Sequence, residues 1–143
     1  MKKVIATLIV LAAGILTVNA QKTAAAQHSM GKSSQMVMKK DAPQVINLEQ
    51  IIGEFVQKKV TVSPGDYIFE IENNNVGHNV GFVLVKKGSD ISNPKNHIQT
   101  AYVTQQVANN SKQRSKVTHL TTGEYYYFCP LNPTATDNLL IVK

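Results

Sequence analysis

The sequence predicts an all-β protein, built as an antiparallel β-sandwich of about seven strands. Short stretches rich in β-branched and aromatic residues recur after Pro43, and turn-forming residues separate them. No internal repeat points to a solenoid or a propeller. The chain has 143 residues, of which 43% are hydrophobic and 17% are charged, so we expect one packed domain. Because it has a single cysteine, disulfides within the chain cannot stabilise that domain.

The expected strands follow one another along the last two thirds of the chain. The clearest is the stretch after the Pro-Gly-Asp turn, where alternation places Tyr67, Phe69 and Ile71 on the core side. Residues 90–110 carry a mixed pattern, for which we expect a short helix or an irregular excursion. In chain order the expected strands are Val45–Ile52, Phe55–Val62, Tyr67–Glu72, Asn79–Lys86, Lys116–Leu120, Tyr125–Cys129 and Leu139–Val142.

Residues 1–20 have the pattern of a secretory signal peptide. Lys2 and Lys3 precede an apolar run over residues 4–18, and residues 18–20 form a small-residue cleavage site. The run is short for a membrane span and no second run follows it. We therefore expect a periplasmic or secreted protein with no stable membrane anchor after cleavage of the signal peptide.

Residues 21–43 are mostly Ala, Ser, Gln, Lys and Met without hydrophobic periodicity, so we expect a flexible leader before a domain at residues 44–143. The leader holds His28, Met30, Met36 and Met38, and thioether and imidazole groups suit Cu(I). This is a weak alternative site for a soft metal. Chance methionines in a tail are the simpler reading, because a flexible segment specifies no ligand geometry.

Charge and motifs exclude two classes of function. The formal charge of +6 includes two lysines of the signal peptide, and the rest of the chain has 13 basic and 9 acidic residues, dispersed along it. That surplus is too small to predict a nucleic-acid partner. The chain has no Ser/His/Asp signature, no HExxH motif and no glycine-rich phosphate loop. We therefore expect that it is not an enzyme.

Two segments of the sequence carry recognisable motifs. The first is residues 60–71, a strand, a Pro-Gly-Asp turn and a second strand, followed by the loop Gly77-His78-Asn79-Val80. The second is residues 120–130, a turn and an aromatic strand that lead into Cys129 and Pro130. Together these segments resemble the cupredoxins, the blue copper proteins of the plastocyanin and pseudoazurin type, and the second is similar to that family's approach to its copper-ligand cysteine. The resemblance covers residues 43–143 and implies a Greek-key sandwich.

The resemblance also implies copper as a cofactor and assigns two ligands. Cupredoxins hold copper with two His and one Cys in a plane and a weak axial Met. His78 and Cys129 match the first His and the Cys, and Asn79 matches a residue that ties the ligand loops together. The second His and the Met are missing, because Asn132 and Asp137 stand in their places and no His or Met follows Cys129.

Three readings remain open. The chain is a copper protein with a non-standard site at His78 and Cys129, completed by Asn132, Asp137, His97 or His119 and serving electron transfer. It is a copper handler that collects Cu(I) through its leader. Or it is a metal-free interaction module on a cupredoxin fold. The first two readings imply a redox or copper-trafficking protein as partner.

Overall fold

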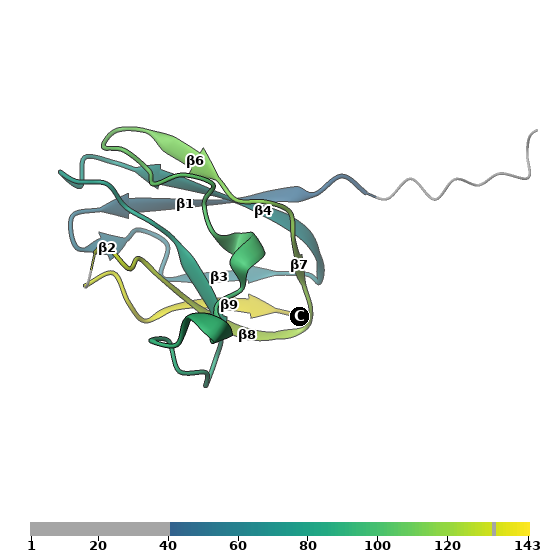
Figure 1. The fold of residues 1–143 in the computed structure, drawn as a ribbon. Helices are drawn as coiled ribbons and strands as arrows, with labels where there is room; N and C mark the ends of the chain where they lie inside the picture. Colours follow the sequence, from purple (N-terminus) through teal and green to yellow (C-terminus); the bar gives the residue numbers. More distant parts are fainter. Residues whose placement is uncertain (1–40, 133) are drawn as a thin grey trace, which may run out of the picture. The chain divides into compact units, whose positions relative to one another are not determined.

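The structure, a computed structural model, describes residues 41–132 and 134–143. The expected signal peptide, and the leader with its His and Met residues, lie outside the described residues, except for residues 41–43. The described part forms nine strands and two 3₁₀ turns (Figure 1). The strands are β1 (Gln44–Ile51), β2 (Glu54–Phe55), β3 (Lys59–Val62), β4 (Gly65–Asn73), β5 (Val83–Lys86), β6 (Lys112–Arg114), β7 (Thr118–Leu120), β8 (Gly123–Phe128) and β9 (Asn138–Val142).

The strands form two sheets, which confirms the all-β Greek-key sandwich. One sheet has the order β2-β1-β4-β6, and β7 also pairs with β4; the other has the order β3-β9-β8-β5. The pairings β1 with β4 and β3 with β9 are parallel, and the others are antiparallel. Both sheets are therefore mixed, whereas the sequence led us to expect antiparallel pairing throughout.

The strand boundaries differ from the expected ones where the chain changes sheets. The stretch expected as one strand at 55–62 is divided, because β2 pairs with β1 in one sheet and β3 pairs with β9 in the other. The strand β6 was not expected, because its sequence Lys-Gln-Arg is polar. Two of its side chains form ion pairs with β4, Lys112 with Glu72 at 2.9 Å and Arg114 with Glu70 at 2.5 Å.

The alternation along β4 is the one that the sequence predicts. Tyr67 is 2% exposed, and Phe69 and Ile71 are fully buried, whereas Glu70 and Glu72 on the other face are partly exposed. A strand with one buried face fixes its register, since a slip by one residue would exchange the two faces. β4 therefore determines how its sheet covers the core.

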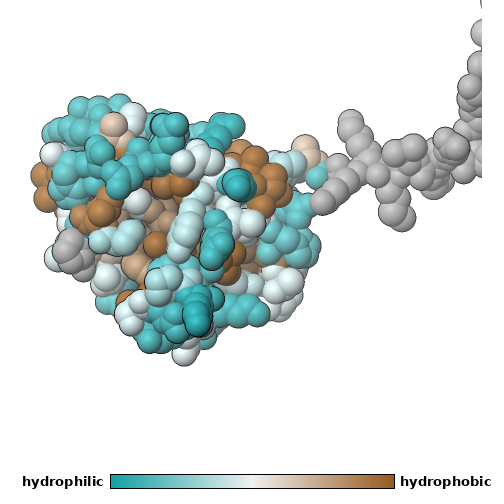
Figure 2. All heavy atoms as spheres, in the orientation of Figure 1, coloured by the Kyte–Doolittle hydropathy of each residue, from teal (hydrophilic) through white to brown (hydrophobic). Residues whose placement is uncertain are grey.

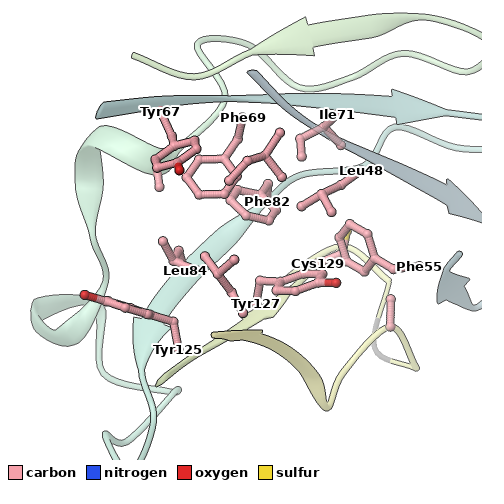
Figure 3. Packing of buried hydrophobic residues seen from close by; sticks show 14 of the residues in the cluster. Leu48, Phe55, Tyr67, Phe69, Ile71, Phe82, Leu84, Tyr125, Tyr127 and Cys129 are labelled. Atoms are coloured by element: carbon pink, nitrogen blue, oxygen red, sulfur yellow. The ribbon is translucent and has the colours of Figure 1, made fainter. Parts of the chain in front are cut away.

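Aromatic rings from both sheets meet at the centre of the core (Figure 3). The Phe82 ring lies 4.9 Å from Phe69, 5.9 Å from Tyr127 and 6.3 Å from Phe55, between ring centroids. The Tyr127 hydroxyl donates a hydrogen bond to the Gln57 carbonyl, and burial raises the pKa of Tyr127. Edge and tilted ring contacts of this kind add to the free energy gained by burial.

Residues 87–111 form the irregular excursion that the sequence predicts, with 3₁₀ turns at Pro94–Asn96 and Gln99–Ala101. Single bridges hold the segment to β5, from His97 to Val85, and to the chain that precedes β5, from Val107 to Val80. This segment lies beside the end of the sandwich at which β5 begins.

Several large hydrophobic side chains stay exposed in the described residues. Figure 2 shows hydrophobic residues lying between hydrophilic ones on one face of the molecule. Single exposed hydrophobic residues are common on soluble proteins, so only those that gather around a concavity indicate a binding surface. The exposed large hydrophobic residues are Val45, Ile52, Val56, Ile91, Val117 and Leu131.

Candidate functional site

Cys129 follows the last residue of β8 and is 1% exposed. Its Sγ accepts a hydrogen bond of 3.3 Å from the backbone N–H of Gly81. The register of β5 and β8 pairs Val83 with Phe128, so that continuing the ladder by two positions would place Gly81 opposite Pro130. Proline has no N–H to continue a ladder. The thiol of Cys129 thus receives a backbone donor where the β5–β8 pairing ends.

The loop after Cys129 is held by hydrogen bonds of its own. The Cys129 N–H donates to the Ala135 carbonyl at 3.3 Å, and the N–H of Asn132 donates to the Cys129 carbonyl at 3.2 Å. The Ala135 N–H donates to the Asn132 carbonyl at 2.9 Å. Thr134 Oγ1 donates to the Gly53 carbonyl at 2.7 Å, which ties the loop to the β1–β2 connection.

Asn132, which the sequence motif matches to the family's second His, is 4% exposed and lies within this loop. Its Nδ2 has no hydrogen-bond partner among the described residues, while its Oδ1 lies 3.3 Å from Thr134 Oγ1. The single proton of that hydroxyl is already directed at Gly53. Exchanging the amide oxygen and nitrogen would let Nδ2 donate to Thr134 and would leave the oxygen unpartnered. Either way, one polar atom of the Asn132 amide stays buried without a described partner.

Asp137, in the position of the family's axial Met, is exposed. Its backbone has a φ of 62°, which lies in the left-handed region that Asp and Asn adopt more readily than most residues. Its Oδ2 accepts a hydrogen bond of 3.4 Å from Thr136 Oγ1. Asp137 thus differs in environment from the buried Cys129 with which the sequence groups it.

His78 is exposed, and its Nδ1 lies 2.8 Å from the carbonyl oxygen of the next residue, Asn79. Asn79 is also exposed, and its Nδ2 donates to Gln106 Oε1 at 3.2 Å. Asn79 therefore links the loop of His78 to the 104–107 segment. The structure gives it no hydrogen bond to the described residues of the Cys129 loop.

A buried residue that the sequence analysis did not single out holds the same two segments together. Asn73, the last residue of β4, is fully buried, and its Nδ2 donates to the carbonyls of His78 at 2.8 Å and Val107 at 3.0 Å. Its Oδ1 accepts from the Val76 N–H at 3.1 Å. The sequence shows Asn73 only as the first of three asparagines, which is typical of a strand end.

A second buried residue, Gln50 of β1, connects the sheet to the Cys129 thiol. Gln50 is fully buried, and its Nε2 donates to the Gly81 carbonyl at 2.8 Å, while the Gly81 N–H donates to Cys129 Sγ. Its Oε1 has no partner among the described residues. The alternation of Ile46, Leu48 and Gln50 along one strand is the signal that could have placed this amide on the core face.

The other two histidines of the domain are engaged elsewhere. His97 Nδ1 lies 2.6 Å from the Tyr102 hydroxyl, and its Nε2 lies 2.8 Å from the Ile91 carbonyl. His119 Nδ1 lies 2.7 Å from Asp66 Oδ1, near the start of β4. The loop of His78 follows the other end of this strand, and seven residues of strand span roughly 23 Å. His119 is therefore remote from the loop of His78.

The donors in this part of the chain do not fit a blue copper centre. Such a centre needs two His, one Cys and a weak axial ligand, usually Met. Among residues 41–132 and 134–143, no three His, Cys, Asp or Glu side chains are grouped so that they could hold a metal ion. Cys129 supplies a sulfur, but the residue that the motif matches to the second His, Asn132, has an amide whose oxygen lies 3.3 Å from the Thr134 hydroxyl.

The chain nevertheless belongs to the cupredoxins. Residues 46–137, more than half of the chain, match the family described as copper binding proteins, plastocyanin/azurin family. Cupredoxins are generally electron-transfer proteins that work with redox partners rather than enzymes, so membership links the chain to copper binding and electron transfer in general.

Solved structures support the fold. The chain is similar to auracyanin B, with a TM-score of 0.56, 16% identity, and coverage of 72% of this chain and 91% of the other. It is similar to the reduced auracyanin of Roseiflexus castenholzii, with a TM-score of 0.55, 16% identity, and coverage of 71% and 98%. For auracyanin A of Chloroflexus aurantiacus, a "blue" copper protein, the TM-score is 0.51 at 18% identity, with coverage of 71% and 100%. No curated protein matches the chain.

No helix in the described part of the chain is long and apolar enough to cross a membrane.

Proposed function

We propose that this protein is an exported binding module on a cupredoxin fold, which works without a blue copper centre. One observation carries the proposal: at the end of the sandwich where this family binds copper, a buried thiol is followed by a loop that closes on its own hydrogen bonds. The position of the second His ligand is filled there by Asn132, which is 4% exposed. The signal-peptide pattern of residues 1–20 supports export.

A second candidate function is copper binding at a non-standard site, used for electron transfer or copper handling. Two observations favour it: the Gly81 N–H donates to the Cys129 sulfur, and the buried amide of Asn132 has an unpartnered atom. Hydrogen bonds to a ligand sulfur tune a metal site. Cys129 and His78 would hold the ion, with Asn132 or Asp137 as an oxygen donor. Bound copper would supply a one-electron couple, and oxygen donors would favour Cu(II) over Cu(I).

A visible absorption titration with Cu(II) separates the two candidates. We would titrate the chain from Gln21 to Lys143 beside its Cys129→Ser variant. The binding module predicts no intense thiolate-to-copper band, or a weak absorption that persists in the variant. A band that saturates at one equivalent and is lost in Cys129→Ser would overturn the module and establish a cysteine-ligated copper site.

Paired histidine variants identify the second ligand if such a band is found. His78→Ala would weaken copper binding, whereas His119→Ala, which changes an exposed histidine paired with Asp66 instead, would leave it unchanged. Equal effects of both variants would mean that His78 is not a ligand. A competition titration with Cu(I), on chains with and without residues 21–40, tests the second reading, in which the leader with its His and Met residues collects Cu(I).

A further inference from the structure

A pocket of about 460 Å³ opens beside the Cys129 loop. Three segments that are distant in sequence line it: residues 81–83 at the start of β5, part of the excursion between Pro94 and Gln106, and the pair Pro130-Leu131 that follows Cys129. Its volume lies within the range of pockets that bind small molecules. The copper ligands that the sequence predicts, His78 and Cys129, are not among its lining residues.

The pocket lining has no charged side chain. It includes no Lys, Arg, Asp or Glu, although the chain has 15 basic and 9 acidic residues. Its one imidazole, that of His97, has both nitrogens engaged, with the Tyr102 hydroxyl at 2.6 Å and the Ile91 carbonyl at 2.8 Å. A charged ligand would lose its hydration there without gaining a partner of opposite charge. The chemistry of the lining therefore selects a neutral ligand.

The walls offer rings and aliphatic groups, and the rim offers amides. Tyr102 and His97 contribute rings, and the His97 ring also packs edge-on against Phe128 at 5.9 Å between centroids. Gln105 at the rim is exposed and supplies an amide that can exchange a hydrogen bond with the ligand. Aromatic walls with a few polar groups at the rim suit a flat apolar molecule.

Gly81 lines this pocket, and its backbone conformation does not require a glycine. Its φ lies outside the left-handed region, unlike that of Gly77 at 93°. A Cβ built on Gly81 would meet only the Pro130 ring, at 3.5 Å, which is an ordinary contact. The backbone would therefore accept a side chain at this position, and the absence of one leaves the space beside Pro130 open.

We propose that this pocket binds a neutral, apolar aromatic molecule of two or three rings. The inference deepens the proposed binding module, because it names the chemical class of its ligand. It does not depend on the absence of copper, since the pocket lining excludes His78 and Cys129. A copper titration and a ligand titration can therefore fail independently of each other.

The test uses the chain from Gln21 to Lys143 and the neutral fluorophore N-phenyl-1-naphthylamine. We expect saturable fluorescence enhancement at one molecule per chain. Leu131→Glu, which puts a carboxylate on the pocket wall, should weaken binding at least fivefold. Val117→Glu is the matched control, because Val117 is 47% exposed, Leu131 is 41% exposed, and only Leu131 lines the pocket. Equal thermal stability of the two variants would show that both are folded.

Two further measurements keep the test decisive. The anionic analogue 8-anilinonaphthalene-1-sulfonate should bind more weakly than the neutral probe, although the chain is basic. Amide resonances of Gly81 and Val103 should shift on addition of the neutral probe, and that of Val117 should not. The inference is wrong if the neutral probe does not saturate, if both glutamate variants bind equally well, or if the sulfonate binds more tightly.

Discussion

Replacing Gln50 with Glu tests the buried hydrogen bonds that connect Gln50, through Gly81, to the Cys129 thiol. Gln50 is fully buried, and its amide N–H donates to the Gly81 carbonyl at 2.8 Å. A carboxylate of the same shape has no hydrogen to donate, so it would face that carbonyl as a buried and uncompensated charge. The protonated acid, by contrast, can still donate to Gly81. We therefore expect Gln50→Glu to destabilise the protein in a way that depends on pH.

The sign and the size follow from the linkage between protonation and folding. Burial raises the pKa of the introduced carboxyl in the folded state above its unfolded value of about 4.3. Stability is then close to that of the parent protein below about pH 4.3, and it falls by about 1.4 kcal/mol per pH unit up to the folded-state pKa. If the buried acid stays protonated to neutral pH, Gln50→Glu costs about 3–4 kcal/mol at about pH 7.

Urea denaturation at about pH 4.5 and about pH 7 measures this difference, each time against the parent protein. Gln105→Glu is the control, because Gln105 is exposed and the same change of charge there should shift stability by about 0.5 kcal/mol or less at either pH. A Gln50→Glu protein that loses the same free energy at both pH values would refute the reasoning. It would mean that the side chain leaves the core instead of being buried beside Gly81.

Three further predictions test the core, a loop and the candidate site. Phe82→Ala removes a ring that is 2% exposed and packed against three others, and should cost about 3–5 kcal/mol in urea denaturation. Tyr126→Ala, on the outer side of β8, should cost about 1 kcal/mol or less, and equal losses would contradict the core assignment. The Ser92 hydroxyl and N–H both donate to Asp90 Oδ1 and lower the pKa of that carboxyl. Ser92→Ala should therefore raise the pKa of Asp90, which an NMR titration measures. An unchanged pKa would contradict the prediction. Asn132→His adds an imidazole to the loop of Cys129 and should strengthen Cu(II) binding and move the absorption spectrum towards a blue-copper type; if neither changes, this position does not reach the metal.

The sequence predicts the core of this fold well, because the core depends on local pattern. The alternation over residues 67–72 identifies the buried face of β4, and the aromatic run before Cys129 identifies β8. Pairing partners are harder to predict, because they depend on contacts between distant residues. The two parallel pairings, β1 with β4 and β3 with β9, leave no local signal that separates them from antiparallel ones. The polar strand β6 forms because Glu70 and Glu72 of its neighbour offer it ion pairs.

Only those residues of the candidate site that lie in recognisable motifs could be predicted from the sequence. The sequence places His78 in a loop and Cys129 at the end of a strand, but it does not show that one is exposed and the other buried. It also misses Gln50 and Asn73, since an amide in a strand or at a strand end has no pattern of its own until its neighbours are known. Their buried hydrogen bonds, to Gly81 from one and to His78 from the other, connect residues that lie up to 31 positions apart.

The same bonds explain how this end of the sandwich can keep a cupredoxin shape with an incomplete ligand set. In this chain the Cys129 loop is closed by backbone hydrogen bonds and by Thr134, and the thiol is held by Gly81, which Gln50 supports in turn. Among the candidate ligands, only Cys129 and Asn132 take part in these contacts, and none of the contacts requires an ion to satisfy the backbone. Because these contacts form without a bound ion, the other candidate ligand positions are free to change while the fold persists. In the proposed binding module, function depends on what the loops and the pocket contact, which is why the charge-free pocket beside Leu131 is the surface to test.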